Sequence, residues 1–234
     1  MGRRSNPKRR IVMRVLAAFL LVALVGGAWL WWTLQHWTPP ETEHPDQGAY
    51  VGEADGAVKF RTLGALGASF VYLAASEGDE GKDARFTANY AAAREAGLQV
   101  GAVHRFDPCA MADGQSANFV TIVPRGKELL PPAIELDVTA KDCPERVSDA
   151  AVESELMTLI NQIETHSGKP VILKISPGFE DTYAMASRIE RNLWLTRTRL
   201  APTYGGRPWL MWTANDALLS EASDEPIDWV VVQP

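Results

Sequence analysis

Beyond residue 48, short apolar runs alternate with segments whose apolar residues recur at helical spacing. The run at 68–75, ASFVYLAA, contains many strand-forming residues and predicts a strand buried on both faces. The next segment, 84–97, places Phe86, Tyr90 and Ala93 on one helical face and ends at Gly97. Eight runs predict strands in this way, at residues 49–52, 68–75, 98–106, 132–138, 170–176, 193–196, 208–213 and 228–233.

Two further segments predict helices, at residues 114–123 and 148–168. In the second, Ser148 is the expected N-cap and Gly168 the expected end. Strands that alternate with helices form parallel sheets covered by helices. Eight strands in about 190 residues therefore predict an α/β fold, an irregular (β/α) barrel with several helices shortened or missing. An open, doubly wound sheet is the alternative.

An uncharged apolar run near the N-terminus, residues 15–32, predicts a membrane-spanning helix. Basic residues flank only its N-terminal side, so the positive-inside rule places Met1 in the cytoplasm. A cleaved signal peptide is the alternative, with GGA before Trp29 as the cleavage site. In both interpretations the rest of the chain is exported.

We therefore expect four segments. Residues 1–14 form a basic cytoplasmic tail, 15–37 a transmembrane anchor, 38–47 a polar linker and 48–234 the barrel domain. This order predicts a single-pass protein of the cytoplasmic membrane with its barrel on the outer, periplasmic or extracellular, side. An exported domain permits a disulfide between the two cysteines, Cys109 and Cys143, although two free thiols are the alternative.

The charge of the chain limits the choice of partner. Six basic residues lie before residue 15, and no acidic residue occurs before Glu41. Subtracting those six from the 23 Lys and Arg leaves 17 against 29 Asp and Glu, so the remainder carries about −12. Nucleic acid is not an expected partner, because its phosphates require a basic surface.

Polar residues at the ends of apolar strands are the candidates for chemistry, because ligands of a barrel bind at the carboxyl ends of its strands. The chain offers Glu77, His104, Glu135 and Asp137 at such places. Residues two apart in a strand share a face, so Glu135 and Asp137 are expected to project into the same space. Paired carboxylates of this kind are typical of glycoside hydrolysis.

These segments occur in an order that resembles glycoside hydrolase family 25, the lysozyme-type muramidases. The resemblance rests on ASEG (75–78), DARFTANYAAAREAGLQVGAVHRF (83–106), QSANFV (115–120) and LPPAIELDV (130–138), and extends to GKPVILKIS, LWLT and GRPWLMW. It implies an irregular barrel, peptidoglycan as the substrate, and no metal or other cofactor. Cys109 and the segment KDCPERVS are similar to a bacterial subgroup with the same cysteine pair, which implies a disulfide between adjacent strand-end loops.

Several positions of the resemblance carry different residues. Tyr50 stands where the family's first strand has an active-site Asp, and Glu135 and Asp137 reverse the family's Asp-x-Glu order. WTA at 212–214 replaces Trp-Gln-Tyr. Glu77 and His104 keep the family's residues, and so does Asp228 near the end of the chain.

The first hypothesis is a membrane-anchored lysozyme-type hydrolase acting on peptidoglycan, with Glu135 as acid/base and Asp137 as the stabilising carboxylate. The residues expected to bind the substrate are Tyr50, Glu77, His104 and Trp212. The second hypothesis is an inactive relative that binds glycan or serves as an envelope scaffold. Structural alternatives exist for single residues: Glu135 and Asp137 pair with a basic side chain such as Arg105, and His104 and Trp212 belong to the core.

Overall fold

A computed structural model describes residues 7–126 and 128–234. The chain divides into two units, Met1–Trp37 and Thr38–Pro234. In the first unit, helix α1 (Pro7–Gln35) contains a segment, Ile11–Gln35, that is long and apolar enough to cross a membrane, with a mean hydropathy of 2.4. A signal sequence near the N-terminus has the same character. Residues 1–6 of the expected basic tail lie outside the described residues.

The second unit is built around a single nine-stranded sheet in its described residues. The strands are β1 (Gln47–Val51), β2 (Ala68–Glu77), β3 (Gly81–Lys82), β4 (Gln99–Arg105), β5 (Ala133–Leu136), β6 (Ile172–Ile175), β7 (Asn192–Thr196), β8 (Met211–Leu218) and β9 (Ile227–Val232). Their order is β1-β9-β8-β7-β6-β5-β4-β2-β3, and β1 also pairs with β2. This pairing closes eight strands into a barrel, which confirms the expected fold class and excludes the open sheet.

One strand departs from the parallel arrangement that the sequence predicts. β9 runs antiparallel to both of its neighbours, β1 and β8, whereas the other barrel pairs are parallel. The connection from β8 to β9, residues 219–226, is too short for a parallel crossover, which needs about a dozen residues or more. The short strand β3 is a further addition that the apolar pattern does not reveal.

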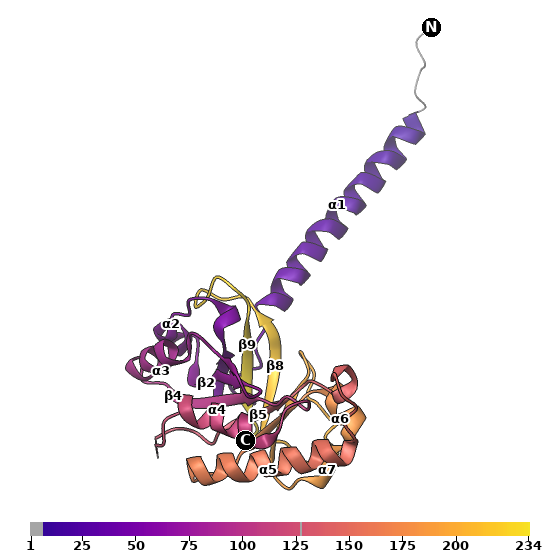
Figure 1. Cartoon of the computed structure of the whole chain (residues 1–234). Helices are drawn as coiled ribbons and strands as arrows, with labels where there is room; N and C mark the ends of the chain where they lie inside the picture. Colours follow the sequence, from indigo (N-terminus) through magenta and orange to yellow (C-terminus); the bar gives the residue numbers. More distant parts are fainter. Residues whose placement is uncertain (1–6, 127) are drawn as a thin grey trace. The chain divides into compact units, whose positions relative to one another are not determined.

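Helices accompany the earlier strands, and no helix joins β7 to β8 or β8 to β9 in the described ranges (Figure 1). Three helices occupy the segments predicted to be helical: α3 (Phe86–Glu95), α4 (Ala112–Ile122) and α5 (Asp149–Ser167). The expected ends of α5 are confirmed, because Ser148 Oγ accepts from the Ala151 N–H and Gly168 has a φ of 69°. Short segments missed by the sequence pattern are α2 (Phe60–Ala65), α6 (Pro177–Tyr183), α7 (Met185–Arg188) and the 3₁₀ turns η1 (Glu53–Asp55) and η2 (Ala140–Asp142).

Alternate side chains of the strands fill the inside of the barrel. The central cluster consists of Phe70, Tyr72, Val103, Ala133, Ile172, Trp194, Met211 and Val230. Gly101 faces the Tyr72 ring, and a Cβ there would lie 2.3 Å from a ring carbon, so the packing requires glycine. The two-residue alternation continues toward the carboxyl ends of the strands: Glu135 follows Ala133 on the inner face, and Lys174 follows Ile172.

The segment expected to be a linker, residues 38–47, is tied to the barrel. Gln47 begins β1 and donates from Nε2 to the carbonyl groups of Pro39 and His44. His44 Nδ1 in turn lies 3.0 Å from the carbonyl oxygen of Val232 in β9. These contacts pack the segment against the first and last strands, so it forms part of the barrel unit.

The expected disulfide is present. Cys109 follows β4, Cys143 follows η2 after β5, and the bond joins them across 34 residues of chain. It therefore links the segments that leave two adjacent strands, as the resemblance implies.

Candidate active site

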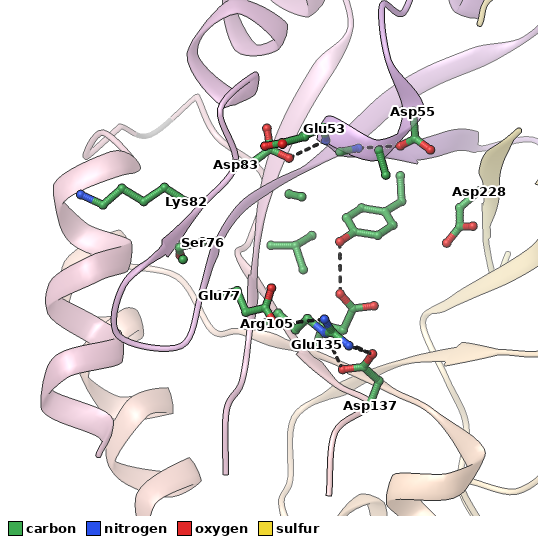
Figure 2. Close-up of a pocket in the computed structure, with 16 residues that line it drawn as sticks. Glu53, Asp55, Ser76, Glu77, Lys82, Asp83, Arg105, Glu135, Asp137 and Asp228 are labelled. Atoms are coloured by element: carbon green, nitrogen blue, oxygen red, sulfur yellow. Dashed lines mark hydrogen bonds and ion pairs between the residues drawn. The ribbon is translucent and has the colours of Figure 1, made fainter. Parts of the chain in front are cut away.

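A cleft of about 530 Å³ lies at the carboxyl ends of the parallel strands. Seven acidic residues line it: Glu53, Asp55, Glu77, Asp83, Glu135, Asp137 and Asp228. The basic residues of the lining are Lys82 and Arg105. Figure 2 shows Glu77 and Asp137 on either side of Arg105, with Asp228 apart from them on another strand. The strand ends thus bring acids from distant parts of the sequence into one space.

Glu135 lies at the floor of the cleft, which we define as Tyr50, Glu135, Lys174 and Asp228. Its Oε1 is 2.6 Å from Lys174 Nζ, and its Oε2 accepts a hydrogen bond of 3.1 Å from the Tyr50 hydroxyl group. Both oxygens therefore face donors, which is the bonding pattern of a carboxylate.

Lys174 is a buried cation between aromatic rings. Its side chain is 5% exposed, and its Nζ lies 3.7 Å from the centroid of the Tyr50 ring and 5.2 Å from that of Trp194. The ammonium group also lies 3.7 Å from Asp228 Oδ2. A charge buried this deeply is stable only with partners, and two carboxylates and two rings supply them.

Asp228 and Asp55 have raised pKa values. Burial is the main cause of the rise to about 7 at Asp228; nearby Glu135, Asp55 and Asp216 also raise this pKa, while Lys174 lowers it. At Asp55 the rise again comes mainly from burial, and the backbone N–H of Gly52 opposes it.

Tyr50 connects the floor to the barrel core. Its ring packs edge-on against Trp194, and burial together with the neighbouring Glu135 raises its pKa well above the usual value. The hydroxyl group therefore stays protonated and donates to Glu135. A tyrosine at this place supplies a hydrogen bond where the family pattern has a negative charge.

The rim of the cleft is formed by Glu77, Arg105 and Asp137. Asp137 lies just beyond the end of β5 and receives three hydrogen bonds from Arg105, from Nε to both carboxylate oxygens and from Nη2 to Oδ2. Arg105 Nη1 also donates to Glu77 Oε1 at 3.0 Å. Asp137 therefore pairs with Arg105, and Glu135 pairs with a different base, Lys174.

The opposite wall of the cleft is fixed by carboxylates that accept from the backbone. Asp55 accepts from the Gly52 N–H, Asp83 accepts from the Glu53 N–H, and Glu53 accepts from the Ala84 N–H. These bonds hold the turn after β1 against the segment after β3. Three of the seven acids thus have a structural task.

His104 does not reach the cleft, which corrects its expected place among the substrate-binding residues. It has no exposed surface and follows Val103, so it points outward from the barrel toward α4. Its ring lies between Ser76 Oγ, at 2.8 Å from Nδ1, and Gln115 Oε1, at 3.3 Å from Nε2. Burial lowers its pKa to about 4, so the ring is neutral and serves as a core hydrogen-bonding group.

Trp212 also lies outside the cleft and is the second correction. The residue is 4% exposed, and its Nε1 donates to the carbonyl group of Arg197 at 2.6 Å. It is next to Met211, which faces the barrel interior, so the alternation of β8 turns Trp212 outward. The ring packs against His44 and Trp209.

Two residues of the floor and one of the rim were not assigned from the sequence. Lys174 is the charged residue of an otherwise apolar strand, and this was the available signal. Arg105 entered only as a pairing partner, and Asp228 only as a position kept from the family pattern. Among the described residues no group of His, Cys, Asp or Glu is arranged to hold a metal ion.

The family model described as Glycosyl hydrolases family 25 matches residues 50–217, which contain most of the barrel. This chain belongs to that family. Family 25 membership agrees with the closed eight-stranded barrel.

Relatives of the family 25 chain include solved and curated proteins. A family 25 glycosyl hydrolase from Bacillus anthracis has a TM-score of 0.75 and 26% identity, covering 85% of this chain and 92% of that one. The uncharacterized protein YegX of Escherichia coli is 25% identical over 167 residues, 69% of this chain. Lysozyme M1 of Streptomyces globisporus is 37% identical over 73 residues, 31% of this chain and 25% of its own. The chain spans 58% of the length of YegX.

Proposed function

We propose that this chain is a lysozyme-type glycoside hydrolase that cleaves the glycan strands of peptidoglycan. The observation that carries the proposal is the gathering of carboxylates from β2, β5 and β9 in one cleft of a family 25 barrel. Glycoside hydrolysis requires one carboxyl group that protonates the leaving oxygen and one carboxylate that stabilises the sugar cation or attacks it. The name of the relative Lysozyme M1 supports the same substrate.

The geometry favours roles for Glu135 and Asp137, at the end of β5, that differ from those expected from the sequence. Both oxygens of Glu135 accept from donors, so we propose it as the anionic carboxylate next to the sugar, in place of the acid role expected from the sequence. Asp137, oriented by Arg105 at the rim, is proposed to contact the substrate as a second carboxylate. Tyr50 and Glu77 line the same cleft and are proposed to position the glycan.

We further propose that α1 anchors the protein in the cytoplasmic membrane with the barrel on the outer side. The support is the apolar length of Ile11–Gln35 and the excess of Lys and Arg before it. An anchored barrel would act on the peptidoglycan that lies within reach of the outer face of the cytoplasmic membrane. Peptidoglycan outside the cell and the membrane are thus the two proposed partners.

The test uses the full chain in detergent with purified peptidoglycan, and measures soluble muropeptides and new reducing ends. We expect release by the wild type and a loss of at least about 100-fold in Glu135→Gln, because a transition-state carboxylate is removed. Glu95→Gln is the matched control, since Glu95 is exposed at the end of α3, pairs with Arg61 and does not line the cleft.

Binding of peptidoglycan by the wild type without any release would refute the proposal and favour the inactive relative. Equal release by Glu135→Gln and the wild type would leave the hydrolase standing and refute the role of Glu135.

A further inference from the structure

Lys174 faces two carboxyl groups of the cleft, and it holds them unequally. Its Nζ lies 2.6 Å from Glu135 Oε1, within hydrogen-bonding distance, but 3.7 Å from Asp228 Oδ2. Glu135 also accepts a hydrogen bond from the Tyr50 hydroxyl group. In contrast, the carboxyl group of Asp228 makes no hydrogen bond to another residue in the described ranges. Each oxygen of Glu135 therefore accepts a hydrogen bond, whereas Lys174 acts on Asp228 only as a charge beyond hydrogen-bonding distance.

The surroundings of Asp228 favour its protonated form. Its side chain is 24% exposed, and the charged or titratable groups that face it come from five elements: Lys174, Glu135, Asp55, Asp216 and Tyr50. Burial and the three neighbouring acids raise its pKa to about 7, and Lys174 alone opposes them. A carboxyl group of this kind has the protonation state that a general acid needs near neutral pH.

The two groups lie close enough to act on one glycosidic bond. The oxygens nearest Lys174 Nζ are separated by no more than the sum of the two distances, about 6.3 Å. Paired carboxyl groups of glycosidases lie roughly 5–9.5 Å apart. Glu135 comes from β5 and Asp228 from β9, so a sugar bound in the cleft can be approached by both.

We propose that Lys174 is a positioning residue that gives the two carboxyl groups different roles, holding Glu135 as the anion and leaving Asp228 as the proton donor. The inference rests on the proposed function, glycoside hydrolysis in this cleft. Asp228 gives its proton to the leaving oxygen as the bond from that oxygen to the sugar carbon breaks, and the Glu135 carboxylate stabilises the positive charge on the carbon. A water molecule then bonds to that carbon and gives a proton to the Asp228 carboxylate, which restores the site.

The first experiment measures the pKa of Asp228 directly, by carbon-13 NMR of its carboxyl group in the full chain, with Asp228→Asn used for assignment. In the wild type we expect Asp228 to titrate near 7, well above its ordinary value of 3.8. In Lys174→Met, which keeps the side-chain length and removes the charge, we expect the pKa of Asp228 to rise by about one unit, because an opposing cation is lost. Lys174→Arg keeps the charge and should restore most of the wild-type value.

An Asp228 that titrates near its ordinary value of 3.8 in the wild type would overturn the proposal, and this measurement needs no Lys174 variant to fold. An unmoved Asp228 in a folded Lys174→Met protein would also overturn it. The NMR titration needs no catalytic activity, so it tests the effect of Lys174 on Asp228 separately from the proposed function.

The second experiment separates the acid from the anion by the leaving group. Peptidoglycan has a poor leaving group, and a dinitrophenyl glycoside of an N-acetylglucosamine oligosaccharide has one that needs no proton. We expect Asp228→Asn to lose about 100-fold or more on peptidoglycan but little on the dinitrophenyl glycoside, and Glu135→Gln to lose on both. Equal losses for Asp228→Asn on the two substrates would refute its role as proton donor.

The pH dependence of kcat/KM adds a readout that a purely structural lysine would not change. The basic limb of the wild-type profile should follow the deprotonation of Asp228 and should move to higher pH in Lys174→Met, in step with the NMR value. A basic limb that stays in place in Lys174→Met would refute the positioning role of Lys174.

Discussion

The floor and the rim of the cleft each pair an acid from the β5 segment with a basic side chain, but in different surroundings. At the floor, Lys174 and Glu135 are 5% and 15% exposed. At the rim, Arg105 and Asp137 are 38% and 31% exposed. Water screens the rim pair and leaves the floor pair strongly coupled. From this difference in exposure we expect the floor pair to contribute more to stability than the rim pair.

The rim has a second constraint that the floor lacks, the covalent bond between Cys109 and Cys143. The disulfide joins the segments that follow β4 and β5, directly beyond the strand ends that carry Arg105 and Asp137. The floor needs no such bond, because its groups lie within strands that the sheet already fixes. The disulfide therefore constrains the segments of the rim, whereas the sheet and the buried ion pair of Lys174 and Glu135 fix the floor.

The largest expected effect comes from removing the disulfide with Cys109→Ser and Cys143→Ser together. A crosslink across 34 residues restricts the unfolded chain by about 4 kcal/mol, so the free energy of unfolding should fall by roughly that amount. Denaturant unfolding followed by tryptophan fluorescence measures the change, and chemically reduced wild type is the control. A loss below about 1 kcal/mol would show that the rim is held by other contacts.

The next effect in size comes from breaking the floor pair with Glu135→Leu. This change leaves the buried ammonium group of Lys174 without its nearest partner and should cost about 3 kcal/mol of unfolding free energy. The double variant with Lys174→Met should recover most of the loss, since neither charge then remains. Additive losses in the double variant would contradict the coupling of the two charges.

The pH dependence of the free energy of unfolding compares two buried titratable groups, Asp228 at the floor and His104 in the core. Asp228 has a folded-state pKa raised to about 7, so its stabilising contribution is complete below the unfolded value near 3.8 and is lost as the pH rises toward 7. His104 has a pKa lowered to about 4, so its contribution is present above about 6.5 and is lost as the pH falls toward 4.

Between about pH 4 and 7 the two slopes oppose each other, each limited to about 1.4 kcal/mol per pH unit. Stability measured across this range should therefore rise more steeply with pH in Asp228→Asn than in the wild type. His104→Gln should change the slope in the opposite direction. A slope that is unaltered in Asp228→Asn would show that Asp228 titrates alike in the folded and unfolded states.

The smallest expected effect comes from the rim pair. Arg105→Met should change the free energy of unfolding by less than about 1 kcal/mol, because both partners are solvated and salt screens them. Unfolding at low and high salt measures it, and the difference between the variant and the wild type should shrink at high salt. A loss as large as that of Glu135→Leu would remove the distinction between floor and rim.

Much of the barrel could be predicted from the sequence because strand and helix periods differ. The runs at 68–75 and 98–106 and the helix with its Ser148 cap were placed within a few residues of β2, β4 and α5. The direction of β9 could not be predicted, because alternation in a strand looks the same when the strand is reversed. Only the length of the connection before it carried that information.

The site was partly predictable for a related reason. Spacing by two residues correctly grouped Glu135 with Asp137, but it could not say which of His104 and Arg105 faces the cleft. The structure turns Arg105 inward and His104 outward, since Val103 belongs to the barrel core. In β8, Met211 likewise faces inward and Trp212 outward. Both corrections therefore have the same cause, because the sequence does not say which of two neighbouring strand residues faces the inside of the barrel.

By itself, the sequence determined eight of the nine strands, the longer helices α3, α4 and α5, the apolar N-terminal segment, the acidic character of the chain beyond it, and the two acids at the end of β5. These properties depend on neighbours along the chain. Tertiary structure alone decided that Lys174 from β6, Tyr50 from β1 and Asp228 from β9 meet at Glu135. Barrel closure brings together side chains up to 178 positions apart, from Tyr50 to Asp228, and the burial that shifts their pKa values exists only after that closure.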